Sequence, residues 1–105
     1  MPTNGFRCEI VDAVDGNPVC VRVYGELDMA TAPEFREALL ALAARNVVVD
    51  LSVLDFLDSS GITAILTARK EVVARGGTLV LDAANGIVRR VLEITGLSTL
   101  LRDGR

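Results

Sequence analysis

Histidine is absent from this sequence, and its absence removes a large share of enzyme chemistry. Without an imidazole, the 105 residues cannot form a Ser-His-Asp or Cys-His catalytic arrangement, nor an imidazole metal site. The two cysteines, Cys8 and Cys20, are too few for a four-ligand zinc site. We therefore expect no catalytic residues and no bound metal.

Aromatic residues and long apolar runs are also scarce. One Tyr, three Phe and no Trp leave the core to aliphatic side chains. No apolar run approaches the ~20 residues of a membrane span, and the N-terminal MPTNGFR lacks the apolar region of a signal peptide. The net charge of −3 gives no reason to expect nucleic-acid binding. We expect a cytoplasmic monomer that binds neither membranes nor nucleic acids directly.

Two short segments near the N-terminus alternate apolar and polar residues, as half-buried strands do. They are residues 6–11 and 19–24. The Asp15-Gly16 pair between them is typical of a two-residue hairpin turn. These features predict an antiparallel β-hairpin.

That turn would also set the register of the hairpin. Cys8 would lie opposite Val23, and Ile10 opposite Val21, so that apolar residues face apolar residues. Cys8 and Cys20 then point to opposite faces of the sheet, which argues against a disulfide between them. We expect two free thiols, as in a reducing compartment.

The segment after the hairpin predicts a break and then a helix. Residues 25–28 (GELD) should end the second strand. Thr31 is a suitable N-cap, with Glu34 as its capping-box partner. The helix should stop near Arg45-Asn46.

The rest of the chain alternates strands and helices. A buried strand is expected at residues 47–51, a helix at 60–75 ended by Gly76-Gly77, a strand at 78–81 and a helix at 85–95 ended by Gly96. Two strand–helix–strand crossovers require parallel pairing, and the hairpin adds an antiparallel part. The sequence predicts one α/β domain with a mixed sheet over residues 1–105, with its core at about 6–101.

The segment Asp58-Ser59-Ser60-Gly61 lies where the second long helix should begin. A nucleophile elbow would need Gly in place of Leu57 and a histidine as base, and a phosphate-binding loop would need a Lys and more Gly. No cofactor is therefore expected. Two interpretations remain open: one of Asp58, Ser59 and Ser60 caps the helix, or a serine carries a phosphate at the positive end of the helix dipole.

Two further carboxylates lie where a strand leads toward a helix. Asp28 follows the second strand, and Asp55 precedes the second long helix within the 55–61 loop. In open α/β sheets such positions carry functional side chains. On spacing alone, a turn residue for Asp28 and a solvated loop carboxylate for Asp55 are the favoured explanations.

Several motifs together resemble the STAS family, and most of all the bacterial anti-sigma factor antagonists. The resemblance covers about residues 6–101 in the right order and spacing. It rests on Gly25-Glu26-Leu27-Asp28, Val49-Asp50-Leu51-Ser52, Phe56-Leu57-Asp58-Ser59-Ser60-Gly61, Gly76-Gly77 and the LEITGL of residues 92–97.

The resemblance implies a STAS-like fold and a partner-switching protein that is not an enzyme. In that family the unphosphorylated antagonist binds an anti-sigma factor that is also a serine kinase, which frees the sigma factor. Phosphorylation of the serine after the motif Asp weakens the complex, and a serine phosphatase resets it. Here the acceptor is Ser59, with Ser60 as second choice. The implied docking residues are Asp28, Asp55, Asp58, Ser60 and Gly61.

Two other functions stay open. STAS domains also occur as cytoplasmic tails of anion transporters and inside stress-sensing complexes, as interaction modules without this phosphorylation. A small-ligand or nucleotide-binding domain would need a cleft near Asp28 and Ser59.

Overall fold

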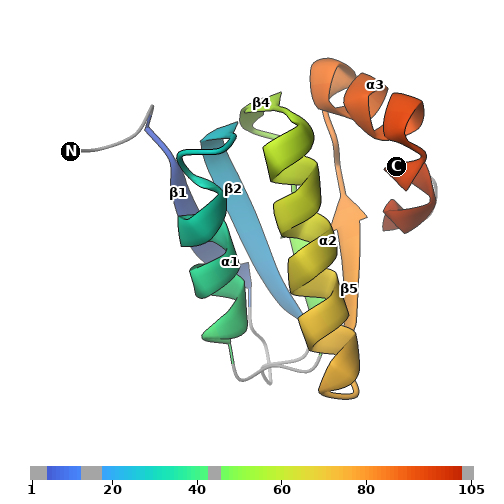
Figure 1. Ribbon diagram of the computed structural model, residues 1–105. Coiled ribbons are helices and arrows are strands. Elements are labelled where there is room, and N and C mark those ends of the chain that lie inside the picture. Colours follow the sequence, from blue (N-terminus) through green and yellow to red (C-terminus); the bar gives the residue numbers. More distant parts are fainter. Residues whose placement is uncertain (1–4, 13–17, 43–45, 103–105) are drawn as a thin grey trace.

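The computed structural model describes residues 5–12, 18–42 and 46–102. They form one mixed sheet with helices α1 (Ala32–Leu40) and α2 (Ser59–Ala74) side by side on one face, as Figure 1 shows. The strands are β1 (Arg7–Asp12), β2 (Val19–Leu27), β3 (Asn46–Asp50), β4 (Leu54–Leu57) and β5 (Thr78–Asp82). Helix α3 (Gly86–Thr95) and the 3-10 helix η2 (Leu97–Leu100) complete the chain. Within these ranges, none of the helices combines the length and apolar character of a membrane span.

The sheet has the order β1-β2-β3-β5, with β4 paired to β2. Among the strands that the structure describes, β1 and β2 are the only antiparallel pair; β2 pairs in parallel with both β3 and β4, and β3 pairs in parallel with β5. The predicted mixed sheet with an N-terminal hairpin is therefore confirmed. β2 is long enough to pair with β3 through Val19–Arg22 and with β4 through Gly25–Leu27.

The hairpin has the predicted register. Cys8 pairs with Val23, and Ile10 pairs with Val21. Beyond Ile10 the register shifts by a bulge, and the predicted Asp15-Gly16 turn lies outside the described residues. Both cysteines are free thiols, as expected.

Two expectations about the strands were wrong. β2 does not end at residue 24, as the alternation predicts, but continues to Leu27; at Gly25, whose φ is +87°, the ladder to β4 shifts its register. The sequence predicts a loop over residues 55–61, whereas Leu54–Leu57 forms strand β4. Its burial runs buried, exposed, exposed, buried, so it lacks the alternation that identifies a strand.

The predicted capping box of the first helix was also wrong. The Thr31 side chain does not cap α1; its hydroxyl donates to the Glu26 carbonyl of β2 and accepts the Asp28 N–H instead. The helix ends at Leu40 rather than near Arg45-Asn46, because Asn46 already belongs to β3. The other elements match their predicted bounds to within a residue, and Gly96 ends α3 with a φ of +79°.

The core lies between the sheet and the helices and is almost wholly aliphatic. Among the aromatic residues, Phe6 and Phe35 are buried and Phe56 is exposed. The C-terminal segment packs as predicted, since Leu97 and Leu101 are buried and Leu101 forms a parallel bridge with Leu81.

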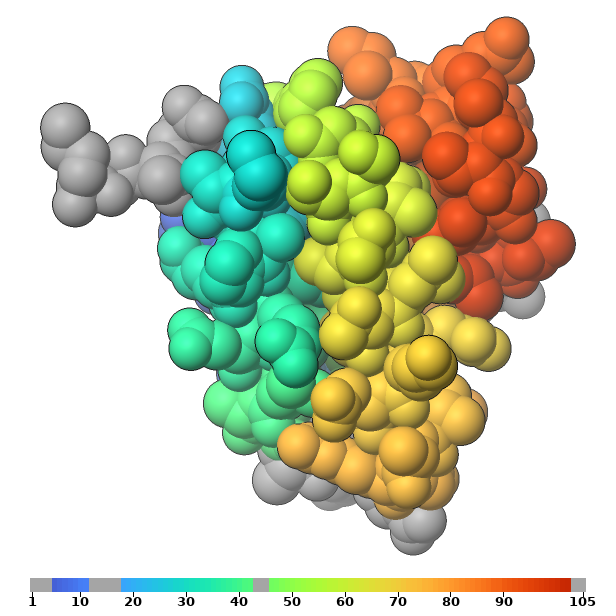
Figure 2. All heavy atoms as spheres, in the orientation of Figure 1, coloured from blue at the N-terminus to red at the C-terminus, as the bar shows by residue number. Residues whose placement is uncertain are grey.

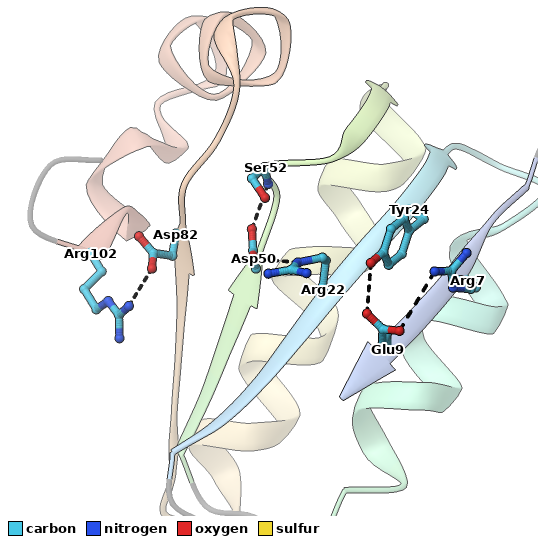
Figure 3. Close-up of polar contacts among 8 residues, drawn as sticks. All are labelled: Arg7, Glu9, Arg22, Tyr24, Asp50, Ser52, Asp82 and Arg102. Carbon is cyan, nitrogen blue, oxygen red and sulfur yellow. Dashed lines mark hydrogen bonds and ion pairs between the residues drawn. The ribbon is translucent and has the colours of Figure 1, made fainter. Parts of the chain in front are cut away.

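The opposite face of the sheet carries paired polar side chains (Figure 3). Arg22 Nε lies 3.0 Å from Asp50 Oδ2, and the Ser52 backbone N–H donates to Asp50 Oδ1 at 2.8 Å. Burial alone would raise the pKa of Asp50, but the hydrogen bonds from Ser52 and Arg22 outweigh it and lower that pKa. At the end of β5, Asp82 pairs with Arg102 of the C-terminal segment.

Candidate functional site

The candidate site forms where β2 and β4 end beside each other. Leu27 and Leu57 are paired as the last residues of the two parallel strands, so Asp28 and Asp58 leave the sheet at the same edge. The Asp58 backbone N–H donates to the Leu27 carbonyl oxygen at 3.3 Å. The fold thus brings together two segments that the sequence separates by 30 residues.

Asp58, and neither serine, is the cap of α2. It has extended backbone angles, and its Oδ1 accepts the Gly61 N–H at 3.0 Å. Ser59 is exposed and Ser60 is half-buried, both in the first turn. Neither hydroxyl makes a hydrogen bond to a residue in the described ranges. The structure thus assigns the structural role to the aspartate and leaves the two hydroxyls uncommitted.

Gly61 allows the first turn of α2 to pack directly on the end of the sheet. A Cβ at this position would lie 2.5 Å from the Leu27 carbonyl oxygen and 2.6 Å from Leu57 Cδ1. Any side chain would therefore push α2 away from β2 and β4. This explains the glycine of the motif as a close-approach residue.

The Asp28 loop is held by a residue that the sequence reasoning treated only as a helix cap. Thr31 is fully buried, its hydroxyl donates to the Glu26 carbonyl at 2.7 Å, and it accepts the Asp28 N–H at 3.0 Å. Asp28 Oδ1 in turn accepts the N–H groups of Ala30 at 2.9 Å and Thr31 at 3.2 Å. The pattern Asp-x-x-Thr before a helix could have suggested this reciprocal turn.

An open hollow of about 350 Å³ lies beside the two serines, between the beginnings of α1 and α2. It is lined by Met29, Ala32, Pro33, Ser59, Ser60 and Thr63. Asp55 lies on β4, is exposed, and does not line this hollow. The described residues contain no cluster of metal-ligating side chains. The geometry suits contact with another macromolecule better than enclosure of a small substrate.

A family model for the STAS domain matches residues 9–102, nearly the whole chain. The chain belongs to the STAS family. Among curated proteins it is 33% identical over 90 residues to the anti-sigma-B factor antagonist of Listeria monocytogenes, covering 83% of this chain and 79% of that protein. It is 33% identical over 96 residues to the anti-sigma-F factor antagonist RsfB of Mycobacterium tuberculosis, covering 88% of this chain and 78% of that protein.

Solved structures show the same fold. An anti-sigma factor antagonist from Mycobacterium paratuberculosis superposes with a TM-score of 0.80 at 27% identity, covering 97% of this STAS chain and 89% of that chain. The anti-sigma factor antagonist SpoIIAA in its unphosphorylated form gives a TM-score of 0.73 at 27% identity, covering 93% of this chain and 86% of that chain. A sulfate transporter family protein from Wolinella succinogenes shares the fold alone. It is 16% identical and gives a TM-score of 0.68, covering 82% of this chain and 72% of that chain.

Proposed function

We propose that this STAS protein is an anti-sigma factor antagonist whose unphosphorylated form binds an anti-sigma factor with serine kinase activity and so frees a sigma factor. The carrying observation is the exposed, uncommitted hydroxyl of Ser59, directly after the capping residue Asp58, in a chain similar to antagonists. The protein acts by binding and is not an enzyme. It works in the cytoplasm as a monomer, without contacting a membrane or nucleic acid.

Ser59 is the phosphate acceptor in this proposal, and a serine phosphatase removes the phosphate. Phosphorylation adds roughly −1.5 to −2 charges and three strong acceptor oxygens. The free N–H groups and positive dipole end of α2 tolerate this anion, so the fold need not change. Ser60 is the second candidate, but it is half-buried in the first turn and thus less accessible.

The switch is local and electrostatic. The new dianion would lie next to Asp58, with Asp28 on the adjacent strand end, and it would enter the hollow at the start of α1 and α2. Losing one well-placed interfacial contact costs about 2–5 kcal/mol, which corresponds to roughly 30- to several-thousand-fold in affinity. We assign partner docking to Asp28, Asp58 and Ser60, and to Asp55 at the margin of this surface. Gly61 is buried, and it serves docking by letting the first turn of α2 pack against the end of the sheet.

The direct test is mass spectrometry of the intact protein and its peptides after incubation with ATP and each anti-sigma kinase of the same genome. One phosphoryl group on Ser59, absent from Ser59→Ala, is the expected result. Modification that persists in Ser59→Ala would move the acceptor to Ser60 or elsewhere. No modification by any kinase would leave a phosphorylation-independent interaction module, such as those of transporter tails or stress-sensing complexes.

A further inference from the structure

We propose that the surface along α1 and α2, beyond the serines, docks an acidic amphipathic helix of the anti-sigma partner. This inference rests on the proposed function and extends it to a second contact region, which we call the distal surface. It is formed by Arg36 on α1 and by Leu66, Thr67, Arg69, Lys70 and Val73 on α2.

The distal surface is continuous with the hollow beside Ser59. A second hollow of about 250 Å³ lies between the two helices and shares Ser60 and Thr63 with the first. A third, of about 440 Å³, continues along α2 and shares Thr63 and Thr67 with the second. Figure 2 shows this face, with α1 and α2 side by side along their lengths.

Apolar side chains on the distal surface lack cover. Leu66 is 43% exposed and Val73 is 49% exposed, although the buried side of α2 is already filled by Ile62, Ile65, Ala68 and Val72. Leu66 and Val73 are seven residues apart, which places them on the same side of the helix about two turns apart. Such a spaced pair fits the apolar stripe of a second helix lying along the groove.

The charges of the distal surface have one sign. Arg36, Arg69 and Lys70 are the charged residues that line the three hollows, and none forms an ion pair with a residue that the structure describes. Three unpaired cations around an apolar strip call for aspartates or glutamates on the occupant. Complementary charge of this kind directs association and fixes the orientation of a docked segment.

The distance from the serines gives this surface a separate role. Ser59 and Lys70 are eleven residues apart on one helix, or about 16 Å along its axis. This exceeds the Debye length of about 10 Å at 0.1 M salt. The distal contact should therefore survive phosphorylation, and its contribution should be the same in both states.

The test is calorimetric titration with the anti-sigma factor that binds the wild-type chain, using a non-hydrolysable ATP analogue so that Ser59 stays unmodified. We expect Lys70→Glu to raise the Kd about tenfold or more. The matched control, Arg90→Glu on the exposed side of α3, should stay within about twofold. The ratio for Lys70→Glu should be the same in a Ser59→Asp background, and circular dichroism should show both variants folded.

Three results would overturn the inference. If Lys70→Glu binds as wild type while Ser59→Asp weakens binding, the docking surface is wrong and the proposed function stands. If light scattering shows that the chain self-associates and that Lys70→Glu abolishes only this self-association, the occupant is a second copy. If the wild-type chain binds no anti-sigma factor of its genome, the proposed function fails and the docking surface with it.

Discussion

Gly61 touches Leu27 so closely that it leaves no room for a Cβ: a methyl group there would lie 2.5 Å from the Leu27 carbonyl oxygen. The obstructing atom belongs to the backbone of the sheet and cannot rotate away. This contact holds the first turn of α2, and with it Ser59, against the end of β2.

We expect Gly61→Ala to lower the free energy of unfolding by about 1–3 kcal/mol, because the overpacked turn must move. Urea unfolding measures this change. Gly86→Ala is the matched control, since its Cβ would meet no atom within 4 Å, and it should be neutral or slightly stabilising. Equal stabilities of the two variants would contradict the close-approach role.

Replacing Thr31 by Val should cost about 1–3 kcal/mol of stability, because the part-buried Asp28 N–H and Glu26 carbonyl each lose their hydrogen bond to the Thr31 hydroxyl. Thr31→Ser retains the hydroxyl and should recover much of this loss. Thr63→Val removes an exposed hydroxyl bonded within α2 and should change stability by less than about 0.5 kcal/mol. Chemical denaturation gives the free energy of unfolding of the three variants. A Thr31→Val protein as stable as wild type would show that the Thr31 hydrogen bonds do not stabilise the Asp28 loop.

The two substitutions of Ser59 should separate binding from switching. The complex of Ser59→Ala with the anti-sigma factor should last as long in the presence of ATP as the wild-type complex lasts without ATP. The reason is that this variant cannot be phosphorylated at position 59. Ser59→Asp should weaken binding less than phosphorylation does, since it adds about one charge instead of two. Titration of both variants and of the phosphorylated protein with the anti-sigma factor gives the order of their affinities. If Ser59→Asp binds as tightly as Ser59→Ala, the switch is not electrostatic.

Acid should remove the stabilisation supplied by Asp50. Its pKa is lower in the folded state than the ordinary value of 3.8, so the unfolded chain takes up the proton first as the pH falls. The stabilisation from Asp50 is complete above about pH 5, and it declines as the pH falls through the ordinary pKa toward the lower pKa of the folded state. Asp50→Asn should therefore be less stable than wild type at pH 7, with a smaller difference at pH 3. Asp55→Asn serves as control, and a difference independent of pH would contradict the assignment.

Thiol labelling should be slow at neutral pH. Burial, with a smaller contribution from Glu34, raises the pKa of Cys8 to about 11, so almost no thiolate is present at pH 8. Burial first, and then Asp50, also raises the pKa of Cys20. Iodoacetamide should modify Cys8 in the Cys20→Ala variant far more slowly than it modifies free cysteine, and the rate should keep rising above pH 9. A rate equal to that of free cysteine at pH 8 would show that the thiol is not shielded.

The sequence predicted the elements whose signals are local. The hairpin register follows from alternation around Cys8, and α3 follows from its apolar spacing and from Gly96. β4 could not be predicted in this way, because Asp55 and Phe56 are both exposed and the strand exists through its pairing with β2. Likewise Gly25 indicates a break by composition, whereas the sheet absorbs it as a register shift.

The candidate site shows the same division. The position of Ser59 at a strand-to-helix turn could be read from the sequence, together with the candidate caps. The choice of Asp58 as cap, and the role of Thr31 as a two-way hydrogen-bonding group, depend on which backbone groups the fold brings within reach. These hydrogen bonds span only three to five residues of sequence, but capping and turn contacts leave no periodic trace.

The parallel pairing of β2 with β4 means that Asp28 and Asp58 become neighbours only when the sheet is complete. A peptide that spans the Asp-Ser-Ser-Gly segment carries the proposed acceptor, Ser59, without the Asp28 half of the surface. A kinase that contacts both strand ends would thus discriminate against nascent, unfolded or proteolysed chains. Phosphorylation would then report on the integrity of the molecule as well as on the signal, and signalling would be confined to correctly folded copies.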